Sequence, residues 1–476
     1  MDTVILKKSS LALRPFEGWG TSLCWWAHRL GYDDGLSQKS AELFYSKEGL
    51  GLNIMRYNIG GGDDPTHNHI TRTDSKIPGW VKLNKKGEKI FTPDADKNQL
   101  NVLRRCIAAT ENGAFVEAFS NSPPYFMTVS GCSSGSHNAI SDNLKTECVS
   151  DFAAYLSDVC KYMEKQMNIR IDSLAAMNEP NTDYWRQYSP KQEGCHFDAG
   201  ESQNRILIAT SKAMKERGLS HTHITASDET NCQLQLLACK KLSKEAWNHI
   251  DRISVHTYSK AWKRLGDYAI RHNIPLWMTE TDWSHSVKSC KNGMGPGLWF
   301  AKKIIQDLTL LSPQAWIMWQ VIGSYTGSEP FDGNYDGPQT DMTKGFWGVA
   351  SCDFDKKEIL LSQKYYCFGQ FTRYIRPGMT VLPIDKLTAG AYNKNDGSLV
   401  IVAVNDRSRE RKLSLDLKEI SSGGEFEVIR TSGSLEEGEH WTKLDSISTN
   451  GTVLNTSLKP YSITTFISKT GFGSLS

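Results

Sequence analysis

Eight short apolar stretches alternate with longer helix-like stretches between about residues 16 and 325, and this alternation constrains the fold of the 476-residue chain most. In chain order the apolar stretches cover residues 16–26, 50–59, 114–122, 171–180, 223–229, 252–259, 275–283 and 315–320. A repeated strand–helix alternation indicates a parallel sheet, and eight units in roughly 300 residues match the size of a (β/α)8 barrel. The sequence therefore predicts an α/β fold with a TIM barrel over residues 16–377.

The chain changes character after residue 377. Residues 378–476 contain short alternating strand patterns separated by Gly, Asn and Asp turns, which is typical of a β-sandwich. Residues 1–15 also read as one or two strands, and we expect them to complete this sandwich at the side of the barrel. The aromatic residues of the module are few and scattered (Tyr392, Trp441, Tyr461), so a structural role is favoured over sugar binding.

Charge and hydropathy narrow the choice of partners. The net charge is +2, from 55 basic and 53 acidic side chains, so the chain has no excess positive field that would favour nucleic acid. No window approaches the roughly 20 apolar residues that span a bilayer, so we expect no membrane span. We also expect a monomer.

The numbered chain leaves localisation open. Its first twenty residues lack the apolar segment of a secretory signal, and its eleven cysteines form no CxxC pair. Such cysteines are typical of reduced thiols in a cytosol. The alternatives are a cytoplasmic protein and a secreted protein whose signal was removed.

Two glutamates stand at the ends of predicted strands. Glu179 ends the fourth apolar stretch and Glu280 lies near the end of the seventh. Since strand ends of one parallel barrel face the same mouth, both carboxyl groups should lie there. Two carboxyl groups at one mouth are what glycoside hydrolysis with retention requires, at a separation of about 5–5.5 Å. A single glutamate would more often be a solvated surface residue, but the pair at this rim favours catalysis.

Other strand ends supply groups that such chemistry needs. Arg56 could keep a nucleophilic carboxylate ionised, while Asn121, His256 and Tyr258 offer hydrogen bonds to sugar hydroxyls. Four tryptophans are candidates for stacking on sugar faces, although core packing is the commoner role of each: Trp25, Trp185, Trp283 and Trp319. Glu117 is ambiguous, because it could contact the sugar or pair with a cation inside the barrel.

Competing constellations are weak. The pairs His67/His69 and His221/His223 have a spacing that a metal could use, but neither has a third ligand nearby in the sequence. Gly60-Gly61-Gly62 follows a strand without completing a nucleotide-binding motif, and no GxSxG elbow is present. We therefore expect no metal and no cofactor.

Several segments together resemble glycoside hydrolase family 30: FEGWGTSLCWWA, NIMRYNIGG, FSNSPPYFMTVSG, AAMNEPN, SVHTYS, MTETDW, MWQ and GQFTRYIRPG. The resemblance implies a retaining enzyme with a barrel and a side-packed β-sandwich that takes strands from both termini. By motif match it makes Glu179 the general acid/base and Glu280 the nucleophile. It also places four residues around the sugar that is cleaved: Arg56, Tyr258 and Trp319, which are already candidates, and Asn178. The expected partner is therefore an oligosaccharide or polysaccharide.

Within that family, WGTSLCWWA and NSPPYFMTVSG are most similar to the branch that cleaves β-1,6-galactan, as in the side chains of arabinogalactan. The other branches, which cleave β-1,6-glucan, xylan or glucosylceramide, remain alternatives. A carbohydrate-binding pseudoenzyme is the alternative from a different class. The presence of both glutamates favours the enzyme. In that case we expect Arg56 to keep Glu280 ionised and a second carboxylate to raise the pKa of Glu179.

Overall fold

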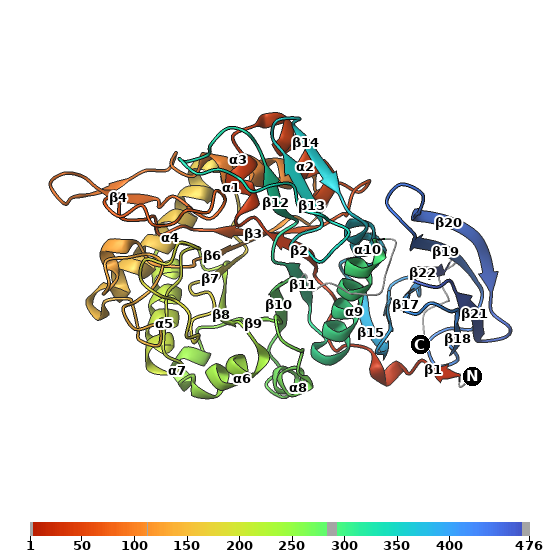
Figure 1. The fold of residues 1–476 in the computed structure, drawn as a ribbon. Helices are drawn as coiled ribbons and strands as arrows, with labels where there is room; N and C mark the ends of the chain where they lie inside the picture. The colour runs from red at the N-terminus through yellow and green to blue at the C-terminus, as the bar shows by residue number, and fades with distance from the viewer. Residues whose placement is uncertain (1–2, 112, 283–292, 469–476) are drawn as a thin grey trace.

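A computed structural model describes residues 3–111, 113–282 and 293–468 (Figure 1). Eight parallel strands form a closed barrel, in the order β10-β11-β2-β3-β6-β7-β8-β9. Their bounds are β2 (Gly18–Ser22), β3 (Ile54–Asn58), β6 (Phe115–Phe119), β7 (Ser173–Ala175), β8 (His223–Glu229), β9 (Arg252–His256), β10 (Leu276–Thr281) and β11 (Ala315–Met318). Each strand falls within one of the eight predicted apolar stretches, so the predicted (β/α)8 barrel is confirmed.

Helices connect the strands around the barrel. They are α1 (Trp26–Leu30), α2 (Asp34–Tyr45), α3 (Lys97–Ala109), α4 (Val149–Met167), α5 (Glu201–Glu216), α6 (Cys232–Lys241), α7 (Lys244–Trp247), α8 (Lys263–Arg271), α9 (Met294–Leu311) and α10 (Gln363–Thr372). Several begin at a side-chain cap; Asp33, for example, accepts a hydrogen bond from the backbone N–H of Leu36 at the start of α2. None of the described helices is both long and apolar enough to cross a bilayer.

Two small sheets belong to the connections of the barrel. The hairpin of β4 (Val81–Leu83) and β5 (Lys89–Phe91) lies between β3 and α3. The strands β12 (Ile322–Thr326), β13 (Ala350–Asp353) and β14 (Glu358–Leu361) follow β11. Both insertions extend connections that leave the carboxyl end of a barrel strand, which is the end that carries active sites in this fold.

A second β structure follows α10. Its six-stranded sheet contains β15 (Thr380–Asp385), β16 (Thr388–Tyr392), β17 (Leu399–Asn405), β22 (Ser462–Ser468), β19 (Glu425–Ser432) and β20 (Glu439–Ser448). A three-stranded sheet contains β1 (Val4–Ile5), β18 (Arg411–Asp416) and β21 (Val453–Leu458). β1 pairs in parallel with β18, so the first strand lies among the last ones in Figure 1.

β17 shows how this module joins the barrel. Val400 and Val402 belong to the large apolar cluster that includes Leu298 of α9, while Leu399 and Ile401 belong to a separate cluster between the two sheets. Because successive side chains of a strand point to opposite faces, one sheet packs on the barrel helices and on the second sheet at once. This arrangement confirms the predicted β-sandwich at the side of the barrel. The domain limits at residues 15 and 377 remain predictions.

Candidate active site

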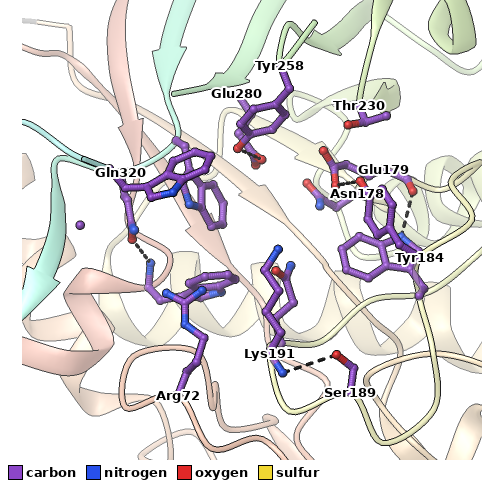
Figure 2. Close-up of a pocket in the computed structure, with 16 residues that line it drawn as sticks. Arg72, Asn178, Glu179, Tyr184, Ser189, Lys191, Thr230, Tyr258, Glu280 and Gln320 are labelled. Atoms are coloured by element: carbon purple, nitrogen blue, oxygen red, sulfur yellow. Dashed lines mark hydrogen bonds between the residues drawn. The ribbon is translucent and has the colours of Figure 1, made fainter. Parts of the chain in front are cut away.

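Glu179 and Glu280 both lie at the carboxyl end of the barrel. Glu280 is in β10, and Glu179 follows β7 with a left-handed φ of +47°. The backbone N–H of Glu179 donates to the carbonyl of Asp228, 2.8 Å away, which holds this unusual turn against β8. The two carboxyl groups line one cavity of about 410 Å³. Figure 2 shows Glu280 beside Tyr258 and Glu179 beside Asn178 and Tyr184.

The two carboxyl groups are close together. A carboxylate oxygen of Glu179, a ring nitrogen of His256 and a carboxylate oxygen of Glu280 all lie within 4.8 Å of one another. Inverting glycosidases hold their carboxyl groups about 6.5–9.5 Å apart to leave room for a water molecule, whereas retaining enzymes hold them about 5–5.5 Å apart. Oxygens this close favour the retaining arrangement over the inverting one.

Arg56 lies beneath the two glutamates and is fully buried. Its Nη1 donates to Oε2 of Glu280 at 2.8 Å, and its Nη2 donates to Oδ1 of Asn178 at 2.9 Å. Its Nη2 also forms an ion pair with Asp228. Arg56 therefore fixes the nucleophile candidate and the residue that precedes Glu179 in one hydrogen-bonded unit.

His256 has a different position from the one expected. We expected it to donate to sugar hydroxyls, but it is fully buried, and both ring nitrogens face carboxylates. Nδ1 lies 3.0 Å from Oε1 of Glu179 and 3.4 Å from Oε1 of Glu280, while Nε2 lies 3.3 Å from Oδ1 of Asp228. Tyr258, by contrast, lines the cavity and donates from its hydroxyl to Oε1 of Glu280 at 2.8 Å.

The charges of this cluster set the pKa values of its members. Burial alone would lower the pKa of His256, but Glu280 and Asp228 raise it to about 10, so the ring is an imidazolium at neutral pH. Burial raises the pKa of Glu280 against the opposing charges of His256 and Arg56. Burial also favours a raised pKa for Glu179, yet the hydrogen bond and charge of His256 lower it below the ordinary value.

This result corrects our expectation of a raised pKa for Glu179. The sequence indicated a second carboxylate beside it, and two neighbouring carboxylates disfavour a double negative charge. It did not indicate that a charged imidazole would lie between them. His256 lies at hydrogen-bond distance from the Glu179 carboxyl group, and its raised pKa favours placing the shared proton on the imidazole.

Asn121 and Glu117 lie away from the cavity lining. Asn121 is buried, and its Nδ2 donates to Oδ1 of Asn58 at 3.5 Å. Glu117 lies inside the barrel, where it pairs with Arg252 and accepts a hydrogen bond from Ser173 at 2.8 Å. Of the two roles considered for Glu117, the structure shows the pairing with a barrel cation.

Three of the four candidate tryptophans line the cavity, namely Trp25, Trp185 and Trp319. The rings of Trp25 and Trp319 meet edge to face with centroids 4.8 Å apart. Trp185 donates from Nε1 to the carbonyl of Glu179 at 3.0 Å, so it also stabilises the turn that carries Glu179. Trp283 lies outside the described residues.

Sequence reasoning missed several cavity residues and one buried residue. The missed lining residues are Arg72, Lys191, Gln192, Thr230, Gln320 and Trp347, among others. Gln320 ends a predicted strand and Thr230 directly follows one, whereas the other four come from connections without strand periodicity. Figure 2 shows the side chain of Lys191 pointing into the cavity. The missed buried residue is Asp228, the penultimate residue of β8, which has a φ of +67°. Its position at a strand end is the same signal that identified Glu179.

Three clusters of described residues have metal-ligand character, of which Asp142, His196 and Asp198, outside the lining of the cavity, form one. Glu179, His256 and Glu280 form another, but Arg56 and Tyr258 already hold the oxygens of Glu280. Asp63, His69 and Cys132 form the third. There, Nδ1 of His69 lies 3.1 Å from Asp63 and Nε2 lies 3.4 Å from Sγ of Cys132, so the imidazole bridges its neighbours by hydrogen bonds.

Comparisons with known proteins agree with this geometry. The model of O-Glycosyl hydrolase family 30 matches residues 7–255. The endo-beta-1,6-galactanase of Hypocrea rufa is 30% identical over 436 residues, which cover 86% of this chain and 82% of that protein. The exo-beta-1,6-galactobiohydrolase of Bifidobacterium longum subsp. longum is 25% identical over 77% of this chain, but the match covers only 30% of that longer protein.

A solved structure shows the same fold. The catalytic domain of the family 30 xylanase C from Talaromyces cellulolyticus superposes with a TM-score of 0.72. The superposition covers 98% of this chain and 99% of that domain at 18% sequence identity. The resemblance noted in the sequence is thereby confirmed, and the chain belongs to glycoside hydrolase family 30.

Proposed function

We propose that the protein hydrolyses β-1,6-linked galactan with retention of anomeric configuration. The observation that carries the reaction type is the pair of facing carboxyl groups, Glu179 and Glu280, with oxygens within 4.8 Å. The substrate is supported by the endo-beta-1,6-galactanase that shares 30% of its residues over most of both chains.

Glu280 is the nucleophile in this proposal. One of its oxygens attacks the anomeric carbon, and the bond between that carbon and the glycosidic oxygen breaks, leaving a glycosyl ester. Two hydrogen bonds orient the carboxylate, one from Arg56 at 2.8 Å and one from Tyr258 at 2.8 Å. The positive charges of His256 and Arg56 oppose the rise in the pKa of Glu280 that burial causes, and so favour its carboxylate form.

Glu179 is the general acid and base. It gives a proton to the leaving glycosidic oxygen in the first step, and it takes one from the attacking water in the second, when the ester breaks. His256 supplies the proton across its 3.0 Å hydrogen bond to Oε1 of Glu179, because the imidazolium holds it in the resting site. Together, Glu179 and His256 regain their starting charge when the attacking water has donated its proton to Glu179.

Aromatic walls support a saccharide as the ligand. Trp25, Trp185 and Trp319 line the cavity, and Trp347 adds a ring that is 39% exposed at its rim. A β-1,6 linkage places an extra CH2 between two rings, so neighbouring sugars can turn sharply. One sugar can then lie at the carboxylates while the next one contacts the exposed tryptophan.

The test is a product analysis with a panel of polymers. Purified protein is incubated with β-1,6-galactan, β-1,6-glucan, xylan and a glucosylceramide analogue, and the first product is followed by NMR. We expect galactan cleavage that first releases the β-anomer. Preference for another polymer would change the substrate but keep the mechanism. First release of the α-anomer would exclude retention, and no turnover of any β-linked substrate would favour a carbohydrate-binding pseudoenzyme.

A further inference from the structure

A second cavity, of about 630 Å³, lies outside the one that holds the glutamates. Its lining comes from the connections that follow β2, β3 and β11, at residues 28, 63–68, 76–78, 95–98 and 331–332. These connections leave the carboxyl ends of barrel strands, so the second cavity opens on the same face as Glu179 and Glu280. Its volume lies within the range of small-ligand sites, about 300–1,000 Å³.

His28 is the central polar group of this second cavity. It is 6% exposed, yet neither ring nitrogen has a hydrogen-bond partner among the described residues. The nearest charge is Asp332, whose Oδ2 lies 3.6 Å from Nε2 of His28. A buried imidazole without partners is costly, and a ligand that both donates and accepts hydrogen bonds would relieve that cost.

The charges around His28 favour an uncharged ligand. The lining contains three acidic residues, Asp63, Asp64 and Asp332, and two basic residues, Lys76 and Lys97. With positive and negative groups nearly balanced, neither a phosphate nor a metal cation would be attracted strongly. Two amide side chains, Asn68 and Asn98, add further hydrogen-bonding groups to this lining. Such a set matches the hydroxyl groups of a sugar.

Phe331 gives the second cavity a fixed aromatic wall. Its ring meets His28 edge to face at 5.4 Å and stacks on Tyr32 at 5.7 Å. Arg29 lies 4.6 Å from the ring centroid and is anchored by Asp336, with Nε 3.2 Å from Oδ1. Packing therefore holds the ring in place before any ligand arrives, which reduces the entropic cost of binding.

The two cavities are neighbours. Ile77 lines the second cavity, while Trp25 and Trp319 line the catalytic one, and all three belong to one cluster of packed apolar side chains. We propose that the second cavity binds an uncharged pyranose unit of the saccharide substrate, away from the bond that is cleaved. The identity of the sugar as galactose rests on the proposed function.

Ligand binding to a catalytically inactive variant provides the first test. The full chain with Glu280→Gln is titrated with β-1,6-galactobiose and with gluco- and xylo-oligosaccharides, and the number of bound sugars per chain is measured by calorimetry and ligand-observed NMR. We expect two binding events, of which only one is lost when His28→Ala is added. Asp332→Gly is a second variant that accommodates the left-handed φ of +48° at this position. His221→Ala, two residues before β8 and therefore at the opposite end of the barrel, is the control.

Kinetics of the active chain provide the second test. His28→Ala should raise KM for the polymer about three- to tenfold while leaving kcat/KM for galactobiose unchanged. The second site would be overturned if the Glu280→Gln chain showed one binding event both with and without His28→Ala. It would also be overturned if His28→Ala changed the kinetics of galactobiose and of the polymer equally. Either result would leave the proposed function intact. Two events with gluco- or xylo-oligosaccharides instead of galactobiose would support the second site and reject the galactan assignment.

Discussion

The Nδ1 atom of His256 lies 3.0 Å from Oε1 of Glu179. On the other side of the ring, Nε2 lies 3.3 Å from Oδ1 of Asp228, a carboxylate whose pKa is lowered by Arg56 and His256 despite its burial. Asp228 therefore holds the imidazole in its charged form, and the imidazole in turn holds a proton beside the general acid. These contacts connect residues from the carboxyl ends of β7, β8 and β9, and they place the charged imidazole beside both Glu179 and Glu280.

Removing the nucleophile should abolish turnover and leave a space that a small anion can use. We expect Glu280→Ala to lower kcat by at least about 10⁴-fold, a loss of roughly 5.5 kcal/mol of transition-state stabilisation. Added azide should attack from the vacated face and yield a glycosyl azide of inverted anomeric configuration, which NMR identifies. A glycosyl azide of retained configuration would reverse the two glutamate assignments.

Removing the acid should have a different signature. Glu179→Ala should lower kcat/KM strongly on polymer, because the leaving sugar needs a proton, but only weakly on aryl glycosides with good leaving groups. Rates on the two kinds of substrate are compared at one pH. If both substrates lose activity equally, Glu179 is not the proton donor.

Asp228→Asn tests whether His256 holds the proton that Glu179 delivers. Without the carboxylate, His256 should lose its proton at a lower pH, so the alkaline limb of kcat/KM should move toward lower pH. His256→Asn should move the limb in the same direction. Asp96→Asn, at a buried aspartate that contacts Tyr57 and Gln99, is the control that should leave the limb unchanged. An unshifted limb in Asp228→Asn would contradict this role.

Glu229→Gln should change the pH dependence of stability. Burial raises the pKa of Glu229 from 4.5 to about 8, so the folded protein binds this proton more tightly than the unfolded chain does. The stabilising contribution is complete below pH 4.5 and is lost as the pH rises toward 8, with a slope of up to about 1.4 kcal/mol per pH unit. Urea unfolding at pH 5, 7 and 8.5 should show that Glu229→Gln reduces this slope. The exposed Glu48→Gln should not, and an unchanged slope in Glu229→Gln would contradict the assignment.

The contact between the barrel and the β-sandwich can be tested at one glycine. A Cβ on Gly369 of α10 would lie 2.2 Å from Cζ2 of Trp441, whose Nε1 donates to the carbonyl of Tyr366 at 2.7 Å. Overpacking of this kind typically costs about 1–3 kcal/mol, so Gly369→Ala should lower the free energy of unfolding by that amount. Gly337→Ala, where the added Cβ meets no atom within 4 Å, is the control. Equal stability of the two variants would show that the contact is loose.

The domain limits predict the behaviour of a truncated chain. A barrel that ends at residue 377 would expose the apolar face of α9 that packs on β15, β16, β17 and β22. We expect such a chain to aggregate, because large exposed apolar surfaces associate in water. Sedimentation and activity of the purified fragment check this; a soluble, fully active barrel would show that the β-sandwich is dispensable.

The sequence by itself determined the barrel, the β-sandwich and the positions of Glu179 and Glu280 near strand ends. Arg56, which we also expected at a strand end, lies instead in the middle of β3. Strand and helix periodicity are local properties, and a parallel barrel brings every carboxyl strand end to one face, so local patterns suffice for these predictions. The turn that carries Glu179 is an exception, because its N–H binds the carbonyl of Asp228 in the next strand, which is a tertiary contact.

Only the tertiary structure decided which charges face each other. His256 is the last residue of its strand, and Tyr258 follows two residues later. The ring of His256, however, faces three carboxylates, and this placement lowers the pKa of Glu179, which we expected to be raised. Glu117 and Asn121, which the sequence could place beside a sugar, pack away from the cavity. A charge acts over a few ångströms through a buried, weakly screening interior, so its effect depends on side-chain directions that strands distant in sequence impose on one another.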